Sequence, residues 1–221
     1  MKKNLYVSVS TDPIKEYQSI AEYAKEMQGY ADFLHCDVMD GKFVENKTYD
    51  ASLVDNINQH SLIMLDVHLM TQEPYKSLDS YISAGANIIT FHYEAFEDKN
   101  DIIDAIKKVK NAKVLVGIAI KPETPVSDIK IFAHDFDVIL VMSVEPGASG
   151  QKFMTMAYEK VKQLDSLRKA NNYKYKIEVD GGITPEIAHK LADFGADMVV
   201  SGSYVYKSKD RYKTIEEFKQ I

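Results

Sequence analysis

The sequence predicts an α/β protein, a single-domain TIM (β/α)8 barrel that spans residues 1–221. Eight short runs rich in Val, Ile and Leu alternate with longer amphipathic, charged segments along the whole chain. These strand–helix units recur at a spacing of roughly 25–30 residues, which is typical of a barrel. No linker rich in Pro, Gly or Ser divides the chain, and eight units in 221 residues favour a closed barrel over an open doubly wound sheet.

The expected strands are near-continuous apolar runs, as strands buried on both faces usually are. They lie at about residues 5–10, 32–37, 62–68, 87–92, 113–119, 137–142, 175–180 and 197–202. Helical patterns between them include 14–28, 99–110, 155–171 and 185–194. In the last pattern, Thr184 suits an N-cap, Pro185 a first helical position and Gly195 the end of the helix.

Composition excludes several functional classes. The chain has 33 acidic against 27 basic residues and a formal charge of −6, which argues against a nucleic-acid surface. Cys36 is the one cysteine, so an internal disulfide is excluded and a buried core position is expected. The apolar runs are shorter than the roughly 18 residues of a membrane span, and the first run is too short for a signal-peptide core. We therefore expect a soluble cytoplasmic enzyme or binding protein.

Polar residues stand at the ends of three expected strands, where barrel enzymes place their functional groups. His35 and Asp37 end the second strand, His68 ends the third and Asp180 ends the seventh. Because side chains alternate along a strand, His35 and Asp37 share one face. Two imidazoles and two carboxylates suit a divalent transition ion such as zinc, iron, manganese or cobalt. A single residue of this kind is more often an ordinary core group, so the prediction depends on all four together.

Glycine-rich segments follow the last three expected strands, at Gly147–Gly150, Gly181–Gly182 and Gly202–Ser203. Backbone N–H groups in such loops bind phosphate, and barrels commonly carry this site after strands 7 and 8. The chain has neither a GxxxxGK[ST] nor a GxGxxG pattern, which argues against a nucleotide cofactor. We expect a phosphorylated small-molecule substrate.

Eight stretches match the motifs of one enzyme family. They are Ser8–Ser10, His35–Gly41, Asp66–Met70, Phe91–Glu94, Met142–Gly147, Gly150–Phe153, Glu178–Ile183 and Gly202–Ser203. Through them the sequence resembles the ribulose-phosphate 3-epimerase family over essentially its full length. The resemblance implies an isomerase that inverts C3 of a ketose phosphate, first of all D-ribulose 5-phosphate to D-xylulose 5-phosphate. It also implies one divalent metal ion per chain, zinc before iron, manganese or cobalt, and a homo-oligomer.

The resemblance assigns roles position by position. His35, Asp37, His68 and Asp180 match the metal ligands of the family, and Asp37 and Asp180 also match its two acid/base residues. Substrate and phosphate contacts match Ser10, His68, Gly147, Ala148, Ser149, Gly150, Gly181, Gly182, Gly202 and Ser203. Met39, Met70 and Met142 match a methionine lining around the reactive centre.

The residue types suit this chemistry. Inverting a carbon next to a ketone requires an acid/base group on each face of an enediolate, and two carboxylates supply them. A cation stabilises the charge of that enediolate, and methionines exclude water without exchanging protons. Asp66 and His92 are further candidates for groups that support the metal ligands, with ordinary core roles as the alternative.

Three departures from the family pattern leave the substrate open. Val9 replaces a proline, Val44-Glu45-Asn46 replaces Val-Pro-Asn, and Gly147–Gly150 lacks the usual phenylalanine. The missing aromatic makes D-allulose 6-phosphate, or a related hexulose phosphate, the nearest alternative substrate. Barrel lyases with an Asp-x-Lys-x-x-Asp pattern fit less well because His68 stands where they need lysine. A non-catalytic phosphosugar-binding protein is the third alternative.

Overall fold

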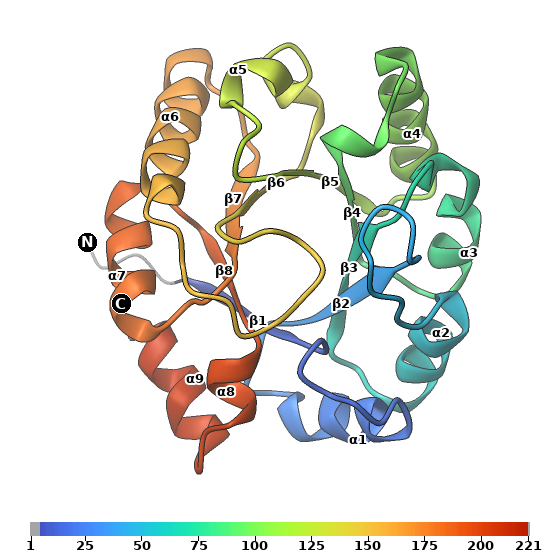
Figure 1. Ribbon diagram of the computed structural model, residues 1–221, viewed down its shortest axis with the longest axis vertical. Helices are drawn as coiled ribbons and strands as arrows, with labels where there is room; N and C mark the ends of the chain where they lie inside the picture. Colours follow the sequence, from blue (N-terminus) through green and yellow to red (C-terminus); the bar gives the residue numbers. More distant parts are fainter. Residues whose placement is uncertain (1–4, 221) are drawn as a thin grey trace.

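The computed structural model describes residues 5–220, in which eight parallel strands form a closed barrel (Figure 1). The strands are β1 Tyr6–Ser10, β2 Phe33–Met39, β3 Met64–Met70, β4 Ile88–His92, β5 Leu115–Ile120, β6 Val138–Met142, β7 Lys176–Asp180 and β8 Met198–Ser201. Closure follows from β1, which pairs in parallel with both β2 and β8. The predicted single-domain barrel is therefore confirmed.

Helices surround this barrel (Figure 1). They are α1 Gln18–Met27, α2 Ala51–His60, α3 Leu78–Ser83, α4 Lys99–Asn111, α5 Val126–Ile129, α6 Met156–Asn171, α7 Pro185–Phe194, α8 Ser203–Tyr206 and α9 Arg211–Lys219. Short 3-10 helices occupy η1 Pro74–Lys76, η2 Tyr93–Ala95 and η3 Ala133–Asp135. The predicted caps of α7 are present: Thr184 accepts a hydrogen bond from Ile187 N–H, and Gly195 adopts φ +116°. Within residues 5–220, no helix has both the length and the apolar character to cross a bilayer.

Several boundaries differ from the prediction by a few residues. The first helix begins at Gln18 instead of residue 14, because residues 11–17 form turns in which the Thr11 N–H donates to the carbonyl of His35. Strands β2 and β3 run on to Met39 and Met70, which pair with each other in register. The longer strands bring these two methionines to the barrel mouth.

The strands bury both faces, but the two faces differ in chemistry. Outward-pointing residues such as Val7, Leu34 and Cys36 pack in the main core between the barrel and its helices. Cys36 has no exposed surface, as predicted. Inside the barrel, Phe33, Ile88, Val138 and Met198 from the four even-numbered strands form an apolar layer.

Toward the carboxyl ends of the strands, the barrel interior becomes polar. The buried polar side chains there include Ser8, Ser10, His35, Asp37, Asp66, His68, Thr90, His92 and Glu178. The register of β2 and β3 aligns His35 with Asp66 and Asp37 with His68, while β6 and β7 align Met142 with Asp180. Strand pairing thus brings ionisable groups that are far apart in sequence to one end of the barrel.

Candidate active site

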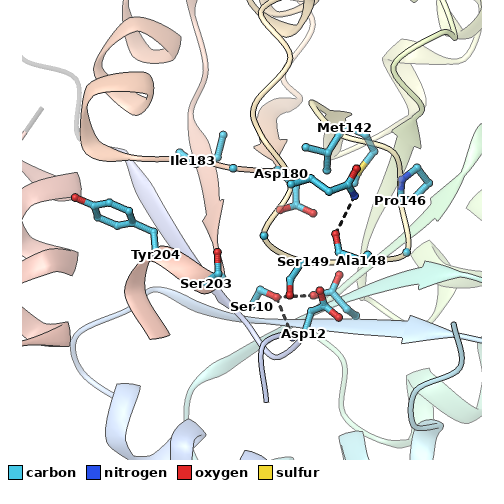
Figure 2. Close-up of a pocket in the computed structure, with 18 of the residues that line it drawn as sticks. Ser10, Asp12, Met142, Pro146, Ala148, Ser149, Asp180, Ile183, Ser203 and Tyr204 are labelled. Carbon is cyan, nitrogen blue, oxygen red and sulfur yellow. Dashed lines mark hydrogen bonds between the residues drawn. The ribbon is translucent and has the colours of Figure 1, made fainter. Parts of the chain in front are cut away.

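A cavity of about 530 Å³ opens at the carboxyl end of the barrel (Figure 2). Fourteen of the sequence-predicted site residues line it: Ser10, Asp37, Met39, Met70, Met142, Gly147, Ala148, Ser149, Gly150, Asp180, Gly181, Gly182, Gly202 and Ser203. The other two, His35 and His68, are fully buried and are not part of its lining. The structure therefore assembles the predicted residues but places both histidines below the cavity surface, including His68, which the sequence also predicted as a substrate contact.

Four side chains form a compact group at the base of the cavity. His35, Asp37, His68 and Asp180 each offer one ligand atom, and these atoms all lie within 4.8 Å of one another. His35 Nε2 lies 3.3 Å from His68 Nδ1, and the same His68 atom lies 3.3 Å from Asp37 Oδ1. A tetrahedral zinc ion with bonds of about 2.0–2.1 Å holds its ligand atoms about 3.3 Å apart. The atoms of His35, His68 and Asp37 therefore match such an ion in spacing, and Asp180, within 4.8 Å of them, completes the ligand set in chemistry.

Asp66 orients the first of these ligands. Its Oδ2 lies 2.6 Å from His35 Nδ1, so that the opposite ring nitrogen, Nε2, faces the other three ligands. Asp66 and Glu178 form a second, deeper acidic group with His35, but neither carboxylate reaches the cavity. Burial and the negative charge of Asp66 raise the pKa of Glu178 well above its ordinary value. This shift favours the uncharged acid form of Glu178, which makes the deeper group less suited to a cation than the first.

Neighbouring carboxylates favour the protonated form of His35 in the metal-free protein. Burial disfavours the charged ring of His35, but the carboxylates of Asp66 and Asp37 outweigh this and raise its pKa well above the ordinary value. A protonated His35 thus supplies positive charge to the group when no ion does. Because a metal ligand must give up this proton, metal binding at these residues is expected to release it.

The two carboxylates of the four-residue group differ in their proton affinity. Burial opposes ionisation of Asp37, but the charge of His35 and hydrogen bonds from His68 and Ser10 outweigh it and lower the pKa. The Ser10 hydroxyl donates to Asp37 Oδ2 over 2.7 Å. For Asp180, burial outweighs the attraction of His35, and the charges of Asp37 and Asp12 add to it, raising the pKa to about 7. Separated pKa values let one carboxyl act as a base while the other acts as an acid.

The loop after β6 lines the cavity, and the loop after β2 packs against it. We call residues 40–48 the β2 loop and residues 144–152 the β6 loop, which crosses the barrel mouth in Figure 1. Asn46 Nδ2 donates to the carbonyl of Gly147 over 2.6 Å. Gly147 has φ +113°, and a Cβ there would lie 2.9 Å from Val44 Cβ. The loops therefore touch directly, without an aromatic side chain at Ala148.

Tight glycine turns place the loop after β7 against the β6 loop. Gly182 has φ +62°, and an added Cβ would lie 2.7 Å from both Gln151 O and Phe153 N. Backbone in this conformation and at this distance accepts only glycine without strain. Gly181 and Gly182 line the cavity at this point. Gly202 and Ser203, at the start of α8, line it beside them.

Sequence reasoning missed several cavity residues, chiefly Asp12, Gln151 and Lys207. Burial and the charge of Asp37 raise the pKa of Asp12 to about 6, and a side-chain hydrogen bond with Ser149 opposes this shift. The Gln151 amide donates to the carbonyls of Glu145 and Ala148 over 2.7 and 2.9 Å, which braces the β6 loop. Lys207 follows α8 at the cavity rim. Extending the search by several residues beyond each strand end would have found Asp12 and Gln151.

Comparison with known proteins shows which family the chain resembles over most of its length. Residues 8–206 match the sequence model of the ribulose-phosphate 3 epimerase family. A Helicobacter pylori ribulose-phosphate 3-epimerase is 37% identical over 200 residues, covering 90% of this chain and 91% of the relative. A Bacillus subtilis protein of the same name is 36% identical over 206 residues, covering 92% and 94%.

A solved structure of 3-keto-L-gulonate-6-phosphate decarboxylase from Vibrio cholerae superposes with a TM-score of 0.74. It covers 99% of this chain and 97% of its own, at 15% sequence identity. A solved 3-hexulose-6-phosphate synthase gives a TM-score of 0.65, also at 15% identity. At such identity these structures show a shared barrel fold and nothing about the reaction.

Proposed function

The chain belongs to the ribulose-phosphate 3-epimerase family, and from this premise we propose that it interconverts D-ribulose 5-phosphate and D-xylulose 5-phosphate with one bound divalent metal ion, first of all zinc. The activity is that of an isomerase acting on carbohydrate phosphates. The observation that carries the proposal is the group of His35, Asp37, His68 and Asp180 at the base of the cavity. It combines a metal-ligand set with two carboxyls whose proton affinities are pushed in opposite directions.

The two carboxyls account for inversion at C3. Asp37, whose pKa is lowered, is ionised and accepts the C3 proton on one face of the sugar. Asp180, whose pKa is raised to about 7 in the metal-free protein, is the group that returns a proton on the other face. In the opposite direction the two residues exchange roles, because a reversible reaction passes through the same states. When bound to the four ligands, a cation supplies positive charge beside the negative charge that develops on the substrate oxygens.

The remaining cavity residues bind and enclose the sugar phosphate. In this proposal backbone N–H groups of Gly181–Gly182 and of Gly202–Ser203 bind the phosphate, since these four residues line the cavity. Lys207 adds a positive charge at the rim. Met39, Met70 and Met142 give the reactive end an apolar wall that takes up no protons.

Metal analysis combined with an activity assay tests the metal requirement. We expect about one zinc ion per chain, loss of D-ribulose 5-phosphate epimerisation on removal with a chelator, and recovery when zinc is restored. His134→Gln alters an exposed histidine that contacts Asp135 and serves as a control for metal binding at surface sites. Full activity of protein shown to be free of metal would contradict the proposal.

The β6 loop favours one alternative substrate. Ala148 stands where the family motif usually has phenylalanine, and both Ala148 and Ser149 line the cavity (Figure 2). D-allulose 6-phosphate, or a related hexulose phosphate, is therefore the second candidate. Measurement of kcat/KM for both sugars decides between them, and a clearly higher value for the hexulose phosphate would replace the first choice. A homo-oligomer is also proposed, and light scattering on the purified protein tests it.

A further inference from the structure

A second histidine contacts His68 on the side away from the four-residue group. His68 Nδ1 faces Asp37, while its Nε2 lies 2.9 Å from Nε2 of His92. His92 is the last residue of β4 and is fully buried. Its other nitrogen, Nδ1, lies 3.1 Å from Oε2 of Glu94. Three side chains therefore form a continuous line from the proposed metal site to a carboxylate.

Donor and acceptor counting allows one arrangement of protons along this line. A metal at His68 Nδ1 needs the lone pair of that atom, so the proton of the neutral ring is on Nε2. This N–H can donate only if His92 Nε2 carries a lone pair. The proton of His92 is then on Nδ1, where it donates to Glu94 Oε2. Each ring thus fixes the tautomer of the next.

The structure holds Glu94 as a hydrogen-bond acceptor. Glu94 Oε1 accepts hydrogen bonds from the backbone N–H of Lys121, over 2.8 Å, and from the Thr124 hydroxyl. The ammonium group of Lys160 donates to the carbonyls of Lys121 and Thr124 over 2.7 and 2.6 Å, which fixes this loop. Hydrogen bonds from His92 and these donors outweigh burial and lower the pKa of Glu94 to about 2.

We propose that His92 and Glu94 are positioning residues that hold His68 in the tautomer that binds the metal, and so set the affinity of the site. The proposal rests on the proposed function, since it assumes a metal at the four-residue group. Neither residue lines the cavity, and neither touches the substrate in this proposal. Their effect reaches the reaction only through the nitrogen that His68 presents.

Glu94→Gln is the sharpest test because it keeps the size and removes one acceptor. The new amide has one oxygen, whereas Glu94 uses one oxygen for Lys121 and Thr124 and the other for His92. If the amide turns its NH2 toward His92, His92 Nδ1 must accept, so the proton of His92 moves to Nε2. Two donors, the Nε2–H groups of His92 and His68, then face each other without an acceptor. If the amide instead turns its oxygen toward His92, its NH2 faces the Lys121 N–H and the Thr124 hydroxyl, which are donors in the unmodified protein. We expect the zinc dissociation constant to rise about 10–100-fold, the usual effect of losing such a partner.

Competition with a fluorescent chelator gives the zinc dissociation constants of the unmodified protein, Glu94→Gln and His92→Gln. Asp135→Asn is the matched control, because it also changes a carboxylate that contacts a histidine, His134 at 3.3 Å, but on the surface. The zinc dissociation constant of this variant should stay within twofold of that of the unmodified protein. Nitrogen-15 NMR of the zinc-loaded unmodified protein should show protons on His68 Nε2 and His92 Nδ1. This tautomer measurement decides the question if the variants fail to fold.

Two results overturn the proposal while the proposed function stands. They are zinc affinity within twofold of the unmodified protein in both Glu94→Gln and His92→Gln, and a proton on His92 Nε2 in the zinc-loaded protein. Failure of the unmodified protein to bind zinc at the four-residue group is a different result, because it overturns the proposed metal requirement itself.

Discussion

Replacing Asp180 with asparagine isolates the proton-transfer role of that carboxyl. The amide has the same shape and still offers an oxygen to the four-residue group, but it does not exchange a proton. A positioned acid/base group contributes about 10²–10⁴-fold to a rate, or about 3–5 kcal/mol of activation free energy. Because Asp180 is also a proposed metal ligand, the loss in kcat should reach the upper part of this range in zinc-loaded Asp180→Asn.

The variant should also leave a distinctive half-reaction. Asp37 remains able to take and return a proton on its own face, so one of the two sugars should exchange its C3 hydrogen with D2O without inversion. NMR of each epimer incubated separately with the zinc-loaded variant measures this exchange. Asp12→Asn is the control, because Asp12 lines the same cavity outside the four-residue group, and we expect less than a tenfold change. Near-native turnover of Asp180→Asn, or equal exchange of both epimers, would refute the reasoning.

Three further predictions follow from the same geometry. The pKa of Asp180 is raised from 3.8 to about 7 in the folded protein, so the free energy of unfolding falls as pH rises between these values, where the folded state keeps a proton that the unfolded state has lost. Between pH 4 and pH 7 the free energy of unfolding of the metal-free unmodified protein should fall by up to about 4 kcal/mol more than that of metal-free Asp180→Asn, as measured by urea unfolding. Parallel pH profiles of the two proteins would contradict the raised pKa. Gly182→Ala should cost about 1–3 kcal/mol of stability and raise KM, because its Cβ meets the backbone of the β6 loop at 2.7 Å; unchanged Tm and KM would contradict this contact. Asn46→Ala removes the 2.6 Å bond to Gly147 and should raise KM severalfold with Tm almost unchanged, whereas an unaltered KM would show that the loop contact does not enclose substrate.

The sequence was most informative where local chemistry decides the structure. The alternation of side chains in β2 predicted that His35 and Asp37 share a face, and both belong to the four-residue group. The caps of α7 at Thr184 and Gly195 were likewise predicted from residue type and position. Carboxyl ends of parallel strands meet at one end of a barrel, which explains why distant residues were correctly brought to one cavity.

Features that depend on register or on loop paths were not predictable in the same way. The contact of His68 with His92 requires the stagger of β3 and β4, which pairs His68 with Thr90 and is absent from the residue pattern. The meeting of Asn46 with Gly147 joins two loops 101 residues apart. The start of α1 at Gln18 reflects turns that carry Asp12 to the cavity, a tertiary arrangement that the helical pattern at 14–28 does not show.

The origin of the C3 hydrogen in the product tests the central claim most directly. Zinc-loaded protein is incubated with D-ribulose 5-phosphate in D2O, and the D-xylulose 5-phosphate formed is examined by NMR. In the proposed mechanism one carboxyl removes the C3 proton and the other returns a proton on the opposite face. Because both carboxyls exchange their protons with D2O, the product should carry deuterium at C3. Epimerisation that retains the original hydrogen at C3 would contradict the two-carboxyl mechanism.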